Sequence, residues 1–441
     1  MRKIFKKHTI LAILLSVTLA CENYTDNYNQ DPNAFGNAAP ELVIGQAQLA
    51  WILLSSSNSA RYAGIFMNQF TGSDRQYITV NSYSVTASEF DDMWDDAYVD
   101  GIAQADITVD AALENENLKL AGVALITKAV LLAEVAALWG DVPFTEANDA
   151  DQFYTPAYDS QSAVFAGVQD LLDTAIDYVE DEPASLYAGN RLSSTATWAE
   201  IAHSLKARYY LITKEYDLAL TEAQNGISTL DGSLVSLHTS STLSENLYYQ
   251  FIVDQRDGYL TADNSYLFQL LDSTDNVDRL LETPGDTERA AYYFSESGGT
   301  DVLNTTDGVF AETSSFNLIS YYETKLIEAE AAIREGQTTI AQDALNSVRD
   351  ELALEYDAMF PQTTSTGDTL LQEILEEKYI TLIGELQPYH DIRRTNNLLG
   401  VPAKTGTEIP QRFLYPQNEI DTNPNVPSPL PGLYDVTEVN Q

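Results

Sequence analysis

Apolar residues recur every three or four positions through most of this 441-residue chain, a spacing typical of amphipathic helices. Five apolar side chains of residues 41–57 fall near one helical face: Leu42, Ile44, Ala47, Leu49 and Ile52. The same spacing predicts helices in five further ranges: 88–114, 118–144, 162–180, 196–228 and 316–354. Ser88 is a candidate N-cap for the second helical range, and Gly140 and Pro143 are expected to end the third.

Two of these ranges contain a short internal break, which predicts helical hairpins. Residues 196–228 break at 214–215, and residues 316–354 turn at 334–337. Small residues gather where the paired helices would cross: Ala329, Ala331, Ala332, Ala341 and Ala344. Tetratricopeptide-like hairpins need such small residues at their contacts. We therefore predict a mainly α fold of irregular tetratricopeptide-like hairpins, with long loop excursions and an extended C-terminal wrap.

The helical pattern fails in two segments, 65–86 and 230–310, which are rich in Gly, Ser, Asn, Asp and Tyr. Excursions of this length in a compact protein are usually functional. Seven prolines after residue 401 predict an extended C-terminal coil on the surface. We divide the chain into a signal peptide at 1–20, a tether at 21–40 and a helical domain at 41–441.

An apolar stretch near the N-terminus is followed directly by Cys21, the only cysteine of the chain. Four cationic residues precede an apolar stretch that is shorter than a transmembrane span, as in a secretory signal. A small residue, Ala20, comes directly before the cysteine, as in bacterial lipoprotein signals. An ordinary secretory peptide with an incidental cysteine is the alternative. We expect lipidation at Cys21, and no later segment apolar enough to cross a bilayer.

The chain is strongly acidic, with 66 Asp and Glu against 23 Lys and Arg and a net charge of −43. Such a charge argues against binding to nucleic acid or to an anionic membrane surface. Catalytic motifs of the GxSxG, HExxH, P-loop and GxGxxG types are missing from the sequence. Counting acids does not exclude a glycosidase carboxylate pair. Residues 149–152 and 272–278 could bind a structural calcium, although neither has EF-hand order.

Several short strings occur in the order in which the SusD/RagB family of nutrient-binding outer-membrane lipoproteins has them. They are NQDPN (29–33), AEVAALWGDVPFTEA (133–147), WAEIAHSLKARYYL (198–211), SYYETKLIEAEA (320–331), DIRRT (391–395) and IPQRFLYPQNE (409–419). The chain resembles this family, in particular its second, SusD-like branch. It departs from the family at Tyr389 and His390, where a tryptophan is usual. For the scarce cations Arg393, Arg394 and Arg412 we expect carboxylate or carbonyl partners that hold the C-terminal wrap.

The resemblance implies a helical, lipid-anchored protein on the outer face of the outer membrane. Such proteins form a lid over a TonB-dependent transporter, to which they deliver oligosaccharides or, in some members, peptides. They have no catalytic activity of their own. Two alternatives from other classes stay open, an exported glycoside hydrolase and a peptide-binding scaffold.

Sugar binding needs an aromatic face for the pyranose ring and polar partners for its hydroxyl groups. We expect Trp51, Trp139 and Trp198 in the core, and look for ligand contacts among side chains of the two irregular segments and on the helix near the first. The candidates are Asn68, Phe70, Asp74, Arg75, Gln76, Tyr77, Tyr83, Trp94, Tyr249, Arg256, Tyr259, Tyr266 and Tyr292. For each tyrosine, packing of a loop onto the helices is the alternative role.

Overall fold

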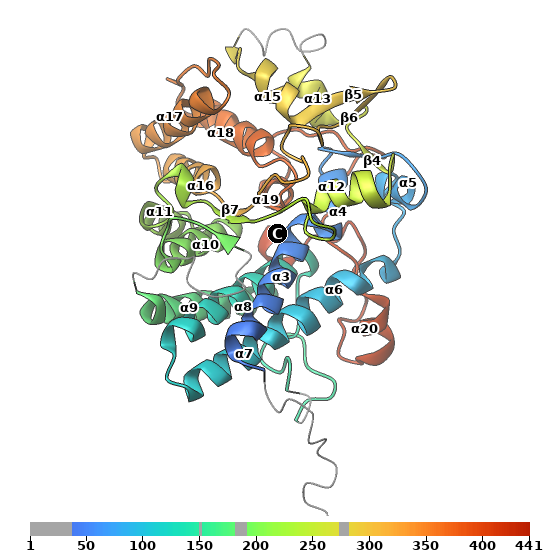
Figure 1. The fold of residues 1–441 in the computed structure, drawn as a ribbon, viewed down its shortest axis with the longest axis vertical. Helices are drawn as coiled ribbons and strands as arrows, with labels where there is room; N and C mark the ends of the chain where they lie inside the picture. Colours follow the sequence, from blue (N-terminus) through green and yellow to red (C-terminus); the bar gives the residue numbers. More distant parts are fainter. Residues whose placement is uncertain (1–37, 150–151, 181–191, 273–281) are drawn as a thin grey trace, which may run out of the picture. The chain divides into compact units, whose positions relative to one another are not determined.

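The structure is a computed structural model that describes residues 38–149, 152–180, 192–272 and 282–441 (Figure 1). By its contacts the chain divides into residues 1–39 and Pro40–Gln441, and every described helix and strand belongs to the second unit. The predicted signal peptide, Cys21 and most of the tether lie outside the described residues. So do residues 150–151 and 273–281, and with them most of the two acidic stretches considered for calcium.

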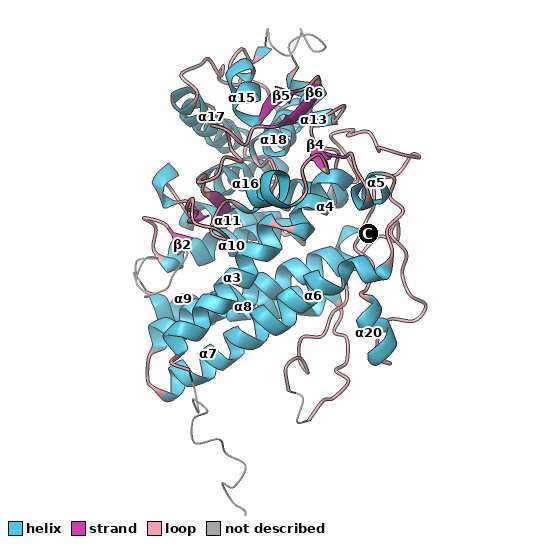
Figure 2. Cartoon of the chain, turned by 45° about the vertical axis from the view of Figure 1, so that its right-hand side comes forward, coloured by secondary structure: helices cyan, strands magenta, loops and turns pink. Residues whose placement is uncertain are grey.

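Helices dominate the described chain, as the apolar spacing predicts (Figure 2). The longer ones are α3 (Pro40–Ser56), α4 (Asn58–Phe66), α6 (Asp91–Ala97), α7 (Ala103–Glu114), α8 (Leu118–Trp139), α9 (Gln161–Val179), α10 (Trp198–Ile212), α11 (Tyr216–Asn225), α15 (Asp286–Tyr293), α16 (Tyr321–Arg334), α17 (Thr338–Glu355), α18 (Gly367–Thr381) and α19 (Gln387–Arg394). The shorter ones are α5 (Gln76–Asn81), η1 (Ala87–Phe90), η2 (Tyr98–Ile102), η3 (Leu230–Gly232), α12 (Leu247–Tyr249), η4 (Gln250–Gln255), α13 (Tyr266–Leu271), α20 (Gln417–Thr422) and η5 (Glu438–Asn440).

The hairpins form a continuous stack, which confirms the predicted fold class. Helix α8 packs against α9, α9 against α10, and α10 against its hairpin partner α11. Helix α11 packs against α16, which pairs with α17 and also contacts α18 (Figure 1). Helices α3 and α7 pack against α8 as well. The alanines predicted at the crossings, Ala329, Ala331, Ala332, Ala341 and Ala344, are all buried.

Helix α8 is the central core helix. It begins at Asn117, whose side chain accepts a hydrogen bond from the Leu120 N–H, and ends at Gly140, whose φ of +94° favours glycine. Among the described residues it is also the one helix long and apolar enough to cross a membrane, contrary to our expectation that no such segment follows the N-terminus. Its apolar window is 94% buried inside the protein, so packing explains this composition.

Three local expectations were wrong. Leu42 is 68% exposed, because the buried face of α3 runs instead through Ile44, Ala47 and Trp51. Thr86 rather than Ser88 caps the helical stretch before α6, since Glu89 stands three residues after Thr86 and completes a capping box. Residues 316–319 form a strand instead of the start of a helix, because they pair with a strand of the central segment.

Short strands form in and around the two irregular segments, and some of them pair over long sequence distances. The strands are β1 (Thr71–Gly72), β2 (Leu192–Ser193), β3 (Leu234–Ser236), β4 (Leu260–Thr261), β5 (Phe294–Ser297), β6 (Thr300–Leu303) and β7 (Phe316–Ile319). They form three antiparallel sheets, β1–β4, β2–β3–β7 and β5–β6. In the first, Thr71 pairs with Thr261 and Gly72 with Leu260. This sheet joins the first irregular segment to the second.

The C-terminal segment wraps along the helices as predicted, but it is partly buried and includes α20 and η5. The three arginines have carboxylate or carbonyl partners as expected, but the partners of Arg394 lie on α16 and α19 and not in this segment. Arg393 donates to the carbonyls of Ala137 and Gln411 (2.9 and 3.0 Å). Arg412 donates to the Trp139 carbonyl, and Arg394 pairs with carboxylates in the core.

Candidate binding surface

Five of the thirteen candidate residues are buried, which contradicts their predicted contact with a ligand. Phe70 is fully buried against Tyr248 and Phe310. Trp94 packs among core aromatic side chains, including Trp139. The others are Asn68, Tyr77 and Tyr83, which are 2–6% exposed. A ligand on the surface cannot reach these side chains unless the fold opens.

Polar atoms of two of these buried side chains hold loops together, and those of a third join two helices. Asn68 donates to the Pro402 carbonyl (3.0 Å) and accepts from the Tyr266 N–H (3.1 Å). Tyr83 donates to the Phe66 carbonyl and accepts from the Lys404 N–H (2.9 Å). The alternative role considered for the loop tyrosines, packing of loops onto helices, therefore applies to Tyr83. For Tyr77, Arg61 donates to the hydroxyl at 2.9 Å.

The β1–β4 pair brings five of the remaining candidates to one place. Asp74, Arg75 and Gln76 are exposed where α5 begins, directly after β1. Arg256 is exposed just before β4, and its guanidinium lies 5.9 Å from the centre of the half-exposed Tyr259 ring. The Ser73 N–H donates to the Tyr259 carbonyl (2.8 Å), so the two segments touch. We call these five residues the α5–β4 surface.

Three half-exposed candidates lie on other elements. Tyr249 belongs to α12, where the charges of Glu312 and Asp254 add to the effect of desolvation in raising its pKa. Tyr266 begins α13 and packs against Tyr379. Tyr292 lies on α15 against Tyr356, with ring centres 5.8 Å apart. These three tyrosines therefore lie on elements other than those that form the α5–β4 surface.

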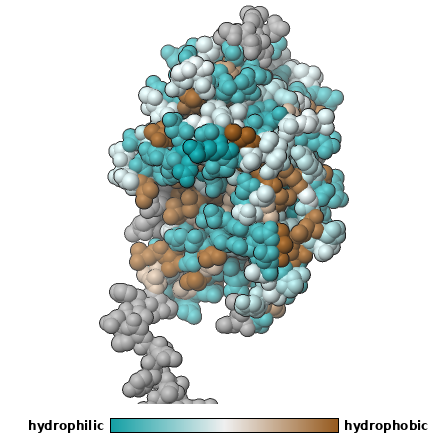
Figure 3. Space-filling view, turned by 90° about the vertical axis from the view of Figure 1, so that its right-hand side faces the viewer, coloured by the Kyte–Doolittle hydropathy of each residue, from teal (hydrophilic) through white to brown (hydrophobic). Residues whose placement is uncertain are grey.

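A groove with a volume of about 370 Å³ lies next to this surface. Its polar lining comes from α4, α6 and η4, and comprises Asn58, Arg61, Asp92, Asp95, Asp96, Gln250 and Gln255. We call it the α6 groove. Arg61 links it to the α5–β4 surface, because its Nε donates to the Tyr77 hydroxyl and the Tyr77 ring lies 6.1 Å from that of Tyr259. Figure 3 shows the side of the molecule that carries α5, where hydrophilic residues are interspersed with smaller groups of hydrophobic ones.

The groove concentrates negative charge around one arginine. Burial, followed by repulsion from Asp100, Asp92 and Asp95, raises the pKa of Asp96 to about 6. The pKa of Asp95 is also raised, first by burial and then by its acidic neighbours. Arg61 is already engaged, since it bonds to Tyr77 and to Asn58 and lies 4.1 Å from the centre of the Phe251 ring.

This arrangement offers hydroxyl-binding groups beside an aromatic face. Carboxylates accept hydrogen bonds, and amides both donate and accept. The sequence analysis missed the groove residues, although it singled out Trp94 in the string DDMWDD. The helical period gives the signal: Trp94 points to the core, while Asp92, Asp95 and Asp96 fall on the opposite side of α6.

Among the described residues, no group of three or more His, Cys, Asp or Glu side chains is placed to hold a metal ion. The acids of the α6 groove are therefore not arranged as a metal site.

Comparison with known proteins gives a family and a fold. Residues 32–416 match the family SusD-like_2, described as "Starch-binding associating with outer membrane". No curated protein matches the chain. A SusD/RagB family protein from Bacteroides thetaiotaomicron has a similar structure, with 20% identity, a TM-score of 0.66 and coverage of 88% of this chain and 95% of that one.

Two further solved structures share the fold. A SusD homologue from Bacteroides uniformis has a TM-score of 0.70 at 16% identity, over 92% of this chain and 100% of its own. A protein named as chitin-binding has a TM-score of 0.64 at 19% identity, over 87% of this chain and 94% of its own. At these identities the likeness concerns the fold.

Proposed function

The chain belongs to the SusD-like family, and from this premise we propose that it captures glycans with the α5–β4 surface and the α6 groove. One observation carries the proposal. The half-exposed ring of Tyr259 lies beside Arg256 and packs against Tyr77. The Tyr77 hydroxyl accepts a hydrogen bond from Arg61, in the wall of a groove lined by carboxylates and amides. An aromatic face next to such hydrogen-bonding groups suits a pyranose ring.

The acidic character of the groove favours neutral glycans over anionic ones. Asp92, Asp95 and Asp96 repel a uronate or a sulfated sugar, whereas they accept hydrogen bonds from neutral hydroxyl groups. The groove is also open, so a bound ligand can leave, as capture and release require. The description of a similar structure as chitin-binding is consistent with a neutral glycan.

We further propose that the captured glycan passes to a TonB-dependent transporter and that a lipid on Cys21 anchors the protein at the cell surface. The family description places its members at the outer membrane, which supports the location. The position of Cys21 directly after the apolar run supports the anchor. In this role the protein supplies binding energy, and no bond is made or broken.

Binding of the full chain to polysaccharides, in a detergent without a sugar headgroup, tests the capture step. Retardation in native gels would identify the glycan. Tyr259→Ala is then expected to weaken binding about tenfold, because a stacked aromatic ring contributes roughly 1 kcal/mol or more. Tyr292→Ala is the matched control, since this half-exposed tyrosine lies on α15, away from the groove, and should leave affinity unchanged.

The same samples separate the alternative functions. Release of reducing ends that stops in Asp96→Asn would replace the proposal with a glycoside hydrolase. Retardation by peptides but by no glycan would move the protein to peptide uptake. Equal loss of affinity in the two tyrosine variants would remove the α5–β4 surface from the site.

Replacing Cys21 tests the anchor separately. Cys21→Ser is expected to release the protein from the membrane fraction, because the only cysteine that could carry the lipid is gone. The released protein should be folded and should still bind the glycan. Fractionation of cells followed by immunoblotting measures the release. Retention of Cys21→Ser in the outer membrane would contradict lipid anchoring through this residue.

A further inference from the structure

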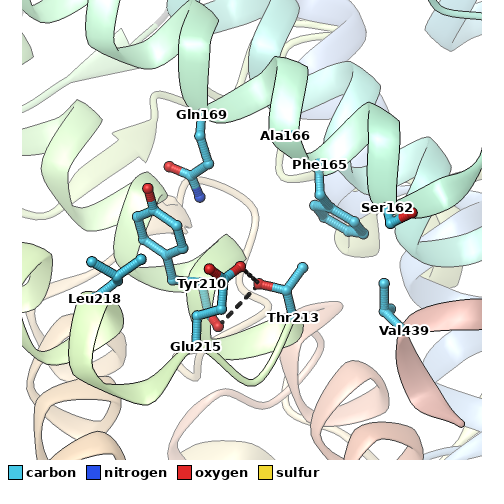
Figure 4. Close-up of a pocket in the computed structure, with 9 residues that line it drawn as sticks. All are labelled: Ser162, Phe165, Ala166, Gln169, Tyr210, Thr213, Glu215, Leu218 and Val439. Atoms are coloured by element: carbon cyan, nitrogen blue, oxygen red, sulfur yellow. Dashed lines mark hydrogen bonds between the residues drawn. The ribbon is translucent and has the colours of Figure 1, made fainter.

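A second pocket lies in the hairpin stack, between α9 and the α10–α11 hairpin (Figure 4). Its volume is about 490 Å³, within the range of small-molecule sites. Phe165 and Gln169 line it from α9, and Tyr210, Thr213, Glu215 and Leu218 line it from the α10–α11 hairpin. It shares no lining residue with the α6 groove.

Gln169 is the informative residue. Its side chain points into the pocket in Figure 4, and the residue is only 8% exposed. Its Nε2 donates to the Lys206 carbonyl at 3.3 Å, but its Oε1 accepts no hydrogen bond from any described residue. A buried acceptor without a donor is unfavourable, and native proteins rarely leave one without a partner. A molecule that donates a hydrogen bond at this position would satisfy the acceptor.

The other groups around the pocket narrow the chemistry of that molecule. The rings of Phe165 and Tyr210 provide apolar faces beside the Gln169 amide (Figure 4). No described Lys or Arg lines the pocket, so an anionic ligand would find no counter-charge. Its one carboxylate among the described residues, on Glu215, is exposed and already accepts a hydrogen bond from Thr213 (2.9 Å). The innermost acceptor is a neutral amide oxygen, which suits a hydroxyl group.

We propose that this pocket is a second binding site that takes one neutral sugar ring or a polyol of that size. A ligand hydroxyl donates to Gln169 Oε1, and the apolar face of the ring packs against Tyr210. The inference does not depend on the proposed function, because the pocket and the α6 groove are separate and share no residue.

Titration of the full chain with methyl α-D-glucopyranoside, methyl β-N-acetylglucosaminide and myo-inositol tests the proposal, in a detergent without a sugar headgroup. Saturable binding of at least one probe by calorimetry or ligand-observed NMR is expected. Gln169→Met keeps the length of the side chain but removes the acceptor, and should weaken that binding at least tenfold. The variant loses both the acceptor without a partner and the long hydrogen bond to the Lys206 carbonyl, so the melting temperature should change little.

Two control variants make the result specific. Asp170→Asn changes the exposed neighbour of Gln169 on α9 and should leave probe binding unchanged. Tyr259→Ala should leave the Gln169-dependent part of probe binding unchanged, although it weakens glycan binding at the α5–β4 surface. Loss of probe binding in Tyr259→Ala, with binding retained in Gln169→Met, would overturn the second site and leave the proposed function standing.

Two further outcomes overturn the proposal. No saturable binding of any probe would mean that water alone fills the pocket. If Gln169→Met unfolds, a crystal structure of the unchanged protein soaked with the bound probe decides. A probe hydroxyl within hydrogen-bonding distance of Gln169 Oε1 is expected there, and a probe found only elsewhere would refute the site.

Discussion

The hairpin stack and the α6 groove handle charge in opposite ways. In the stack, buried acidic side chains form ion pairs with buried or partly buried basic side chains. Glu330, fully buried, accepts hydrogen bonds from Arg394 (2.7 Å), Lys378 (3.1 Å) and Arg334 (2.9 Å). In the groove, three aspartates share the lining with Arg61, whose hydrogen bonds among the described residues go to Tyr77 and Asn58 and not to these carboxylates. The first arrangement fixes helices, and the second leaves acceptors free for a ligand.

A second buried network of paired polar side chains surrounds Glu134 and His390. Arg393 donates to Nδ1 of His390 (2.5 Å), so Nε2 of that ring carries the proton and donates to Glu134 (2.9 Å). Burial opposes ionisation of Glu134, but the His390 hydrogen bond and the charge of Arg208 outweigh it and lower its pKa to about 2. His390 is buried, so this polar network lies in the protein core.

The largest effect is expected from breaking the Glu330 cluster. Glu330→Ala leaves Arg394 and Lys378 with only Asp391 as an acidic partner, in the core. Removing one partner of a buried ion cluster typically costs about 3–5 kcal/mol of unfolding free energy. Denaturant unfolding followed by circular dichroism measures the loss. Glu330→Gln, which keeps shape and acceptor, should lose less.

The control for this variant is a partly exposed pair on neighbouring helices. Asp106 of α7 pairs with Lys128 of α8, and their side chains are 29% and 20% exposed. Asp106→Ala should lower the unfolding free energy by only about 0–1 kcal/mol, because water screens the charges. An equal loss in Glu330→Ala and Asp106→Ala would contradict the contrast between the two regions.

Glu385 differs from Glu134 and Glu330 because its pKa is raised rather than lowered. The pH dependence of stability that follows from this can be used to test the comparison. Burial, followed by repulsion from Glu323, raises the pKa of Glu385 to about 8. Because its pKa in the unfolded chain is about 4.3, the folded state holds an extra proton between these values, and stability falls as the pH rises through this window. Glu385→Gln should match the unchanged protein near pH 4.5 and exceed it at pH 8 by on the order of 1–3 kcal/mol.

Thermal or denaturant unfolding at both pH values tests the Glu385 prediction. A constant difference between Glu385→Gln and the unchanged protein from pH 4.5 to 8 would show that this carboxyl does not titrate in the window.

The helices could be predicted from the sequence because local spacing determines them. The Asn117 cap and the Gly140 stop of α8 lie within a few residues of the apolar pattern that they bound. The strand at 316–319 could not be predicted in this way, since its partner β3 lies about 80 residues earlier. Pairing over that distance overrides local preference.

The binding surface was predictable only in part, for the same reason. The sequence indicated which segments are irregular, and β1–β4 joins them. It did not indicate which aromatic side chains are buried, because burial comes from distant partners. Tyr77 packs on Phe251, and Phe70 on Phe310, across more than 170 residues of sequence. Tyr259 remains half exposed, and nothing local to it distinguishes it from Tyr77.

The smallest effect concerns Asp96, on the groove side of the comparison. Its pKa of about 6 in the folded state lies above its ordinary value of 3.8, so stability falls as the pH rises from about 4 to 6. Asp96→Asn should remove this loss and raise the unfolding free energy at pH 7 by roughly 0.5 kcal/mol, because the half-exposed carboxyl is screened by water. If the groove binds glycan, the unchanged protein should also change affinity near pH 6, and Asp96→Asn should not. If the glycan affinity of the unchanged protein stays constant from pH 5 to 7, the ligand binds away from Asp96. The stability measurement tests separately whether the neighbouring aspartates destabilise the ionised form of Asp96.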